Sequence, residues 1–128
     1  MIGKTVKSLL AGSNTLKALV PVLKMFPYVI NEGTELPAIV YTIDSLDAVY
    51  NKAGWCNDEI SFSVYSASKS YDQLQSIVSA VRGALEYKYT GSGSQDINFI
   101  YLNSFEEDHD GVDTFYNRLN FKVTVNKY

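Results

Sequence analysis

The segment DEISFSVYSASKSYDQLQSIVSAVRGAL, residues Asp58–Leu85, determines most of what can be predicted about the fold. In its first part, Ile60, Phe62 and Val64 alternate with polar side chains. That alternation is the period of a β-strand with one face on a core. A short serine-rich joint, Ser66–Ser70, follows. The segment therefore predicts a half-buried strand that leads directly into a second element.

The second part of this segment predicts an amphipathic helix. Ser70 is the expected N-cap, because a serine followed three residues later by Gln73 is the pattern of a capping box. The apolar positions recur every three or four residues and form one stripe, which we expect to lie on a sheet: Leu74, Ile77, Val78, Val81 and Leu85. Gly83 weakens a helix by about 1 kcal/mol relative to alanine, and we expect it to mark close packing against a neighbour.

The rest of the chain predicts one more helix and four more strands. We expect a helix over Thr5–Leu19, with a break near Gly12, Ser13 and Asn14. Two prolines restrict Val22–Ile30 to an edge strand or a bulged one. Pro37–Asp44 is apolar on both faces, as in a strand inside a sheet, and a long polar loop is expected over Ser45–Asn57. The remaining two strands, Asp96–Leu102 and Phe115–Val125, form an antiparallel hairpin with an acidic loop.

This order, α-β-β-β-α-β-β, predicts an α+β fold with an antiparallel β-sheet of about five strands and two helices packed on one face. The last strand is the most regular. Leu119, Phe121 and Val123 share one face with Asn117, whereas the opposite face, from Tyr116 onward, is polar or amphipathic. With 128 residues, the chain is expected to form a single domain over residues 1–128.

The composition excludes several classes of protein. Hydrophobic residues at 46% and charged residues at 20% are ordinary globular values, so wholesale disorder is excluded. A formal net charge of −3 argues against a dedicated nucleic-acid binder and leaves only passive contact with DNA. The ten tyrosines fit either surfaces that become interfaces or the ordinary preference of tyrosine for sheets.

The lone cysteine, Cys56, excludes an intramolecular disulfide and a four-cysteine zinc site, as is typical of a reducing cytoplasm. Near the N-terminus, Lys4 and Lys7 precede only a short apolar stretch, Leu9–Ala11. That stretch is too short for a signal peptide or a membrane span. We therefore expect no membrane association.

Catalytic patterns are weak. The single histidine, His109, lies in the acidic stretch Glu106–Gly111. Asp108, His109 and Asp110 suggest a metal site or general base of a small hydrolase, but a hydrated loop explains them more simply. An EF-hand is excluded, because glycine is not sixth from Asp108 and the twelfth position is Leu119 rather than glutamate. We expect no catalytic residue, no metal and no cofactor.

Four stretches together resemble the phage tail terminator family, also called tail completion proteins of the head-to-tail junction. They are ELPAIVY (35–41), ISFSVYS (60–66), the helix YDQLQSIVSAVRGAL (71–85) and YNRLNFKV (116–123). Their order and spacing match the family over most of the chain. The LPxIVY entry and the VRxAL helix end are the most specific parts.

The resemblance implies a small α+β structural subunit and brings no catalytic residues. It implies a ring, usually hexameric, that caps the tail tube, ends tail polymerisation and provides the surface for head-tail joining. The implied partners are other copies, the tail tube protein and head-tail connector proteins. The implied location is the head-proximal end of the phage tail in the virion, after assembly in the host cytoplasm.

Three other classes stay open beside this one: a related connector or neck subunit, the small hydrolase, and a generic ligand-binding domain. Trp55 is expected either as a lid on the core or as a partner contact. Arg118 and Lys122 either touch phosphates or carboxylates, or belong to a solvated face. The candidate residues for a subunit or partner interface are Trp55, Tyr65, Glu106, Glu107, Asp108, His109, Asp110, Tyr116, Arg118 and Lys122.

Overall fold

The structure is a computed structural model that describes residues 2–50, 56–88, 95–97 and 100–127. For residues 56, 95–97, 126 and 127 it describes the backbone alone. The elements in chain order are α1 (Ile2–Gly12), α2 (Asn14–Leu19), the 3-10 turn η1 (Val22–Lys24), β1 (Met25–Pro27), β2 (Ala38–Tyr50), β3 (Cys56–Ser68), α3 (Tyr71–Leu85), β4 (Gln95–Ile97), β5 (Tyr101–His109) and β6 (Phe115–Lys127).

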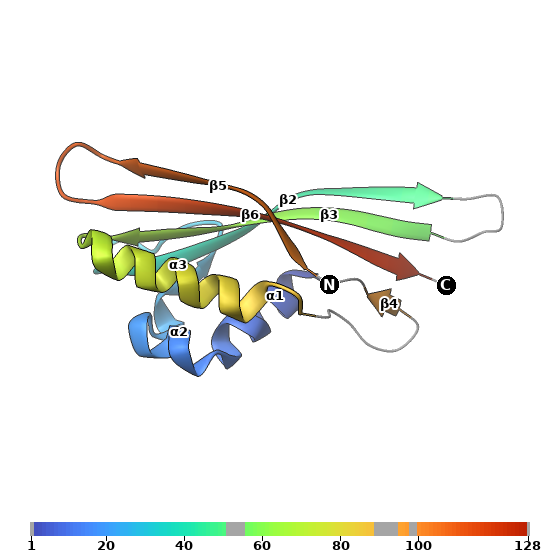
Figure 1. Ribbon diagram of the computed structural model, residues 1–128, viewed down its shortest axis with the longest axis horizontal. Coiled ribbons are helices and arrows are strands. Elements are labelled where there is room, and N and C mark those ends of the chain that lie inside the picture. The colour runs from blue at the N-terminus through green and yellow to red at the C-terminus, as the bar shows by residue number, and fades with distance from the viewer. Residues whose placement is uncertain (1, 51–55, 89–94, 98–99, 128) are drawn as a thin grey trace.

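One mixed sheet carries the fold. Its strand order is β1-β2-β3-β6-β4, and β5 also pairs with β6. β1 runs parallel to β2, and the other pairings are antiparallel. The helices lie together on one face of the sheet, while the β2–β3 and β5–β6 hairpins project at opposite ends (Figure 1). The expected α+β class, with helices on one face, is confirmed.

The sheet is more finely divided than the expected order. β1 is an edge strand of three residues that ends at Pro27, as a proline favours. The single strand expected over Asp96–Leu102 is divided: β4 covers Gln95–Ile97, Ile100 lies outside a strand, and β5 begins at Tyr101. The first helical region breaks where expected. α1 ends at Gly12, and the Ser13 side chain caps α2 by accepting a hydrogen bond from the Leu16 N–H at 3.2 Å.

The core lies between the inner face of the sheet and the helices. At its centre the rings of Phe62 and Phe121 stack with centroids 5.3 Å apart and planes 17° from parallel. The predicted stripe of α3 faces them, with Leu74, Ile77 and Val81 buried. The predicted inner face of β6 is confirmed, since all of its described apolar residues after Phe115 are buried: Leu119, Phe121, Val123 and Val125.

The cap of α3 forms with one change. Ser70 Oγ accepts a hydrogen bond from the Gln73 N–H at 3.3 Å, as expected. The Gln73 side chain does not reach back to the Ser70 N–H. Instead, Ser68 Oγ accepts from that N–H at 3.1 Å and donates to Gln73 Oε1 at 2.7 Å. Ser68 therefore relays the second half of the capping box.

The long loop expected over Ser45–Asn57 is wrong for its described residues. β2 continues to Tyr50 and β3 begins at Cys56. The register between β2 and β3 shifts between Ile43 and Ser45, so Asp44 is an extra residue in the ladder. Beyond such a bulge, the side chains that would have faced one side of the sheet face the other. The strand as a whole therefore does not show a continuous period of two.

The acidic loop expected before Phe115 is also mostly strand. β5 runs from Tyr101 to His109, and each of its acidic residues pairs with β6, for example Glu106 with Arg118. The β5 side chains are exposed except for half-buried Leu102, so apolar periodicity gives no signal there. Pairing with β6, rather than the β-propensity of its own residues, makes this segment a strand.

Gly83 does not mark close packing. A Cβ placed on it meets nothing within 4 Å, so the expectation of a close neighbour is wrong. The glycine simply leaves an exposed helix position without a side chain.

Gly83→Ala is therefore expected to stabilise the protein by about 1 kcal/mol. Alanine lowers the conformational entropy of the unfolded chain and has a higher helix propensity than glycine. Gly111→Ala is the matched contrast, since its φ of +82° strains any L side chain in otherwise open space. Denaturant unfolding measures both variants. A loss of stability in Gly83→Ala would contradict the open environment of that position.

Candidate interaction surface

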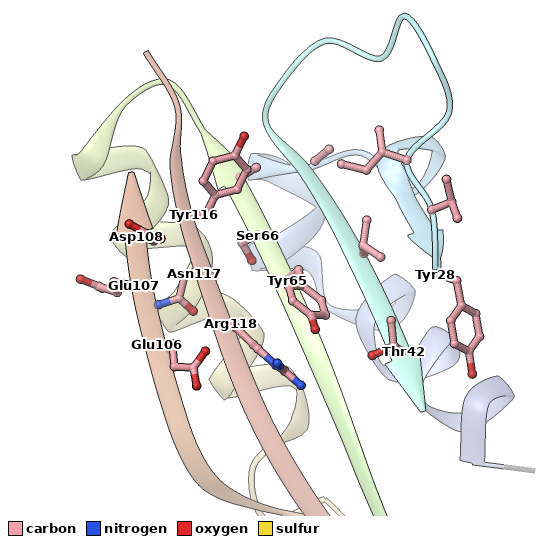
Figure 2. Close-up of a pocket in the computed structure, with 15 residues that line it drawn as sticks. Tyr28, Thr42, Tyr65, Ser66, Glu106, Glu107, Asp108, Tyr116, Asn117 and Arg118 are labelled. Atoms are coloured by element: carbon pink, nitrogen blue, oxygen red, sulfur yellow. The ribbon is translucent and has the colours of Figure 1, made fainter. Parts of the chain in front are cut away.

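The sheet face opposite the helices, here called the outer face, is hollowed into a groove. Side chains alternate along β3 and β6, so Tyr65 and Tyr116 point away from the core that Val64 and Leu119 fill. The hollow has a volume of about 650 Å³. Figure 2 views it with the helices behind the sheet. We call it the outer groove, and define it by Tyr28, Val40, Tyr65, Ala67, Glu106 and Tyr116.

The floor of the outer groove is apolar. Ala38, Val40 and Ala67 are buried although they lie on the face away from the helices. The exposed tyrosines Tyr65 and Tyr116 also line the hollow. A floor of small aliphatic side chains between aromatic rings suits an apolar occupant.

Tyr28 forms the wall on the β1 side. Its φ is +64°, a conformation that bulky residues rarely adopt. Its N–H donates to the Tyr41 carbonyl at 3.0 Å, and its hydroxyl lies 3.3 Å from the Ile43 N–H nitrogen and 3.4 Å from the Ile43 oxygen. The tyrosine thus continues the edge of β2 beyond the end of β1, and fixes its ring beside the groove.

A polar network crosses the middle of the outer face. Arg118 donates from Nε and Nη2 to Ser63 Oγ, both at 3.3 Å, and its Nη2 lies 3.6 Å from Asp44 Oδ2. Ser63 Oγ also bonds the Asp44 carboxylate and lies 2.8 Å from Asn120 Oδ1. The guanidinium of Arg118 sits 5.1 Å from the ring centroid of Tyr65. The network joins β2, β3 and β6 and holds the Arg118 side chain in place.

The opposite wall comes from β5, where the predicted acidic cluster is divided between two faces. Glu106 and Asp108 pair with Arg118 and Tyr116 on the outer face. Glu107 alternates with them, and its carboxylate accepts hydrogen bonds from Gln75 Nε2 at 2.8 Å and from the Tyr71 hydroxyl at 3.4 Å. Glu107 therefore fastens β5 to α3.

The loop after β5 is organised by Asp110. Its Oδ1 accepts the N–H groups of Val112, Asp113 and Thr114 at 2.8, 3.1 and 3.1 Å. These bonds, led by that from Val112, hold the pKa of the Asp110 carboxyl below its usual range. Because three backbone N–H groups already bond this carboxylate, its role is to stabilise the loop.

The candidate hydrolase residues do not converge. His109 Nδ1 accepts a hydrogen bond from the Gly111 N–H at 3.0 Å, and its ring lies 4.5 Å from that of Phe115. Asp108 Oδ1 accepts the His109 N–H at 2.7 Å. Within the described residues, no group of three His, Cys, Asp or Glu side chains is placed to hold a metal ion.

Of the other predicted interface residues, Lys122 lies further along the outer face, in a small hollow with Asp47 and Glu59. Trp55 lies outside the described residues. Sequence reasoning missed Tyr28, Asp44 and Ser63. Tyr28 follows Pro27 in an irregular segment, and Asp44 and Ser63 meet only through the register of β2 and β3.

Two buried side chains beneath this face lack hydrogen bonds within the described part of the chain. They are Ser66, through its hydroxyl, and Asn117, through both polar atoms of its amide. The two residues pair across β3 and β6, with their side chains on the helix side of the sheet, beneath the floor of the groove. Buried groups of this kind destabilise a fold.

No family model matches the sequence, and no curated protein matches it. A solved structure does share the fold. A chain described as "Virion of native gene transfer agent (GTA) particle" superposes with a TM-score of 0.69 at 15% identity. The match covers 94% of this chain and 91% of that chain. At this identity the likeness establishes a common fold along nearly the whole length of both chains.

No helix in the described ranges combines the length and apolar character needed to cross a membrane.

Arg118→Met is expected to cost about 1–2 kcal/mol of unfolding free energy, because it removes the Ser63 bonds and the partly exposed ion pair with Asp44. Lys122→Met is the matched control on the same strand and face, with an expected change within about 0.5 kcal/mol. Urea titration measures both. Equal effects of the two substitutions would show that the network contributes nothing.

The Asp110 loop is expected to respond to acid. Because folding lowers the pKa of Asp110, the stabilisation is present above the ordinary carboxyl pKa of 3.8 and is lost as the pH falls through the lowered value. The amide resonances of Val112, Asp113 and Thr114 should shift together, with a midpoint below 3.8, in an NMR pH titration. Asp110→Asn should abolish this shared transition, whereas Asp108→Asn should keep it.

Proposed function

We propose that this chain is a structural virion protein of the phage tail terminator kind, acting as a single domain. In this role, copies form a ring, hexameric in the family it resembles, on the end of the tail tube. The ring ends tail polymerisation and provides the surface for head-tail joining. Its partners are other copies, the tail tube protein and head-tail connector proteins, and its place is the head-proximal end of the tail.

The observation that carries the proposal is the fold shared with a virion chain over almost the whole of both chains. The resemblance of the 35–41, 60–66, 71–85 and 116–123 stretches to tail terminators is independent of that superposition. Both point to a subunit that works by assembly. We also propose that Asp108, His109 and Asp110 catalyse no reaction. Their side chains accept hydrogen bonds from backbone N–H groups close by in the sequence.

The surface of the chain supports assembly. Large apolar side chains remain exposed at both projecting hairpins, including Tyr50 on β2 and Phe105 on β5, and along the outer groove. Among the described strands, β2 beyond Ile43 pairs only with β3, and β5 pairs only with β6, so both offer a strand edge at opposite sides of the sheet. An interface that joins two different surfaces closes into a ring when the rotation per subunit divides the circle.

Charge supports passive contact with DNA. The outer face carries Asp44, Asp47, Glu59, Glu106 and Asp108 against Arg118 and Lys122. Such a face repels phosphates more than it attracts them, which suits DNA that slides past without binding.

Native mass spectrometry of the full chain, alone and with the tail tube protein of the same genome, tests the proposal. We expect a closed oligomer of one subunit number and an arrest of tube elongation. Monomers under both conditions would contradict it. A pull-down with head proteins, and none with tube, would instead assign the chain to the connector or neck class.

A further inference from the structure

We propose that the outer groove binds the Val22–Lys24 turn, η1, of a second copy of this chain. The inference rests on the proposed ring and names the two surfaces that join neighbouring subunits in it. One surface is the apolar groove between Tyr28 and β5. The other is an exposed turn at the β1 edge of the sheet.

The groove favours an apolar side chain with a cation beside it. Its floor of Ala38, Val40 and Ala67 is apolar, and Glu106 and Asp108 form its acidic wall. Arg118 is the one cation among the described lining residues, and it is held by Asp44, Ser63 and the Tyr65 ring. Because Arg118 already pairs with Asp44, the negative charge of Glu106 and Asp108 is available to a cation from another copy.

The η1 turn has the complementary chemistry. Leu23, the middle residue of the turn, is 89% exposed, and Val22 beside it is 38% exposed. Lys24 follows directly, and no ion pair joins it to another described residue. The first 31 residues contain four lysines and no acidic residue, so the segment that carries the turn is basic.

The turn is also ordered before binding. Pro21 precedes it, and the Lys24 N–H donates to the Pro21 carbonyl at 2.8 Å. A side chain presented by an ordered turn loses less conformational entropy on binding than one on a mobile loop. A leucine held out in this way can bury its apolar side chain in a neighbour's pocket.

η1 does not line the groove of its own molecule. It precedes β1, whereas Tyr28, the wall of the groove on that side, follows the other end of β1, and the acidic wall belongs to β5. We therefore assign the contact to different copies. A turn-to-groove contact joins two different surfaces. Each time a copy is added, one free turn and one free groove remain at the two ends of the assembly. Repetition therefore gives a head-to-tail series that can close into a ring.

The β2–β3 hairpin is another exposed apolar segment that such a groove could receive. It presents Leu46, Val49 and Tyr50. It also carries Asp47 and Glu59 on the outer face, where they would meet Glu106 and Asp108. Like charges brought together in an interface oppose binding, so charge favours the lysine-bearing turn.

Crosslinking of paired cysteines tests the contact. In a Cys56→Ser background, Leu23→Cys is combined with Tyr116→Cys and treated with a short bis-maleimide. We expect a covalent ladder that rises to the subunit number of the ring. Leu23→Cys combined with Tyr50→Cys is the control, in which no ladder is expected.

Charge exchange gives a second measurement that does not depend on crosslinking. Lys24→Glu and Glu106→Lys should each raise the concentration needed for half assembly about tenfold, and the double variant should restore it. Lys88→Glu makes the same charge change at an exposed site after α3 and should alter assembly less than about twofold. Unchanged thermal melting confirms that each variant folds.

The outcomes separate this inference from the proposed ring. A normal ring without a Leu23–Tyr116 ladder and without charge rescue would overturn the contact and leave the ring intact. A ladder only with Tyr50→Cys would also overturn it, because the turn would then meet the hairpin. If the unmodified chain never assembles, even with the tube protein, both proposals fail together.

Discussion

The pairing of β3 with both of its neighbours is the constraint on which the rest of the structure depends. Cys56–Ser68 pairs along its whole length with β6, and for most of it with β2. Because side chains alternate along a strand, this register places Phe62 in the core and Tyr65 in the outer groove at once. A slip by one residue would exchange the two sets. The core and the proposed interface are therefore determined by the same set of backbone hydrogen bonds.

The outer face adds a second requirement on that register. Ser63 is fully buried on the face away from the helices, so its hydroxyl needs partners, and Asp44, Asn120 and Arg118 supply them. Asp44 reaches Ser63 from the point where the β2 register shifts. The irregularity in β2 thus does two things: it brings a carboxylate to the network, and it turns the distal half of the strand so that Leu46 and Tyr50 continue the inner face.

The sequence predicted what depends on neighbours along the chain and missed what depends on pairing across it. The Ser70 cap, the α3 stripe and the two faces of β6 follow from spacing within one element, and all three appear in the structure. The distal half of β2 and the acidic part of β5 have no pattern of their own, because a bulge or full exposure removes it. Tyr28 is positioned by its own backbone and by Ile43, which no local pattern reveals. The groove, built from β2, β3, β5 and β6, could be predicted only in part, as Tyr65, Glu106, Glu107, Asp108, Tyr116 and Arg118.

The superposition at 15% identity has a physical reading in the same terms. A sheet with one face on helices needs alternation in its strands and a stripe on its helix, and many different side chains satisfy both. The inner face is therefore free to change its residues while the fold persists. The η1 turn is under no such requirement from folding, since Leu23 is exposed and contributes nothing to the core. If copies of this chain assemble through this turn, selection acts on its residues separately from the core.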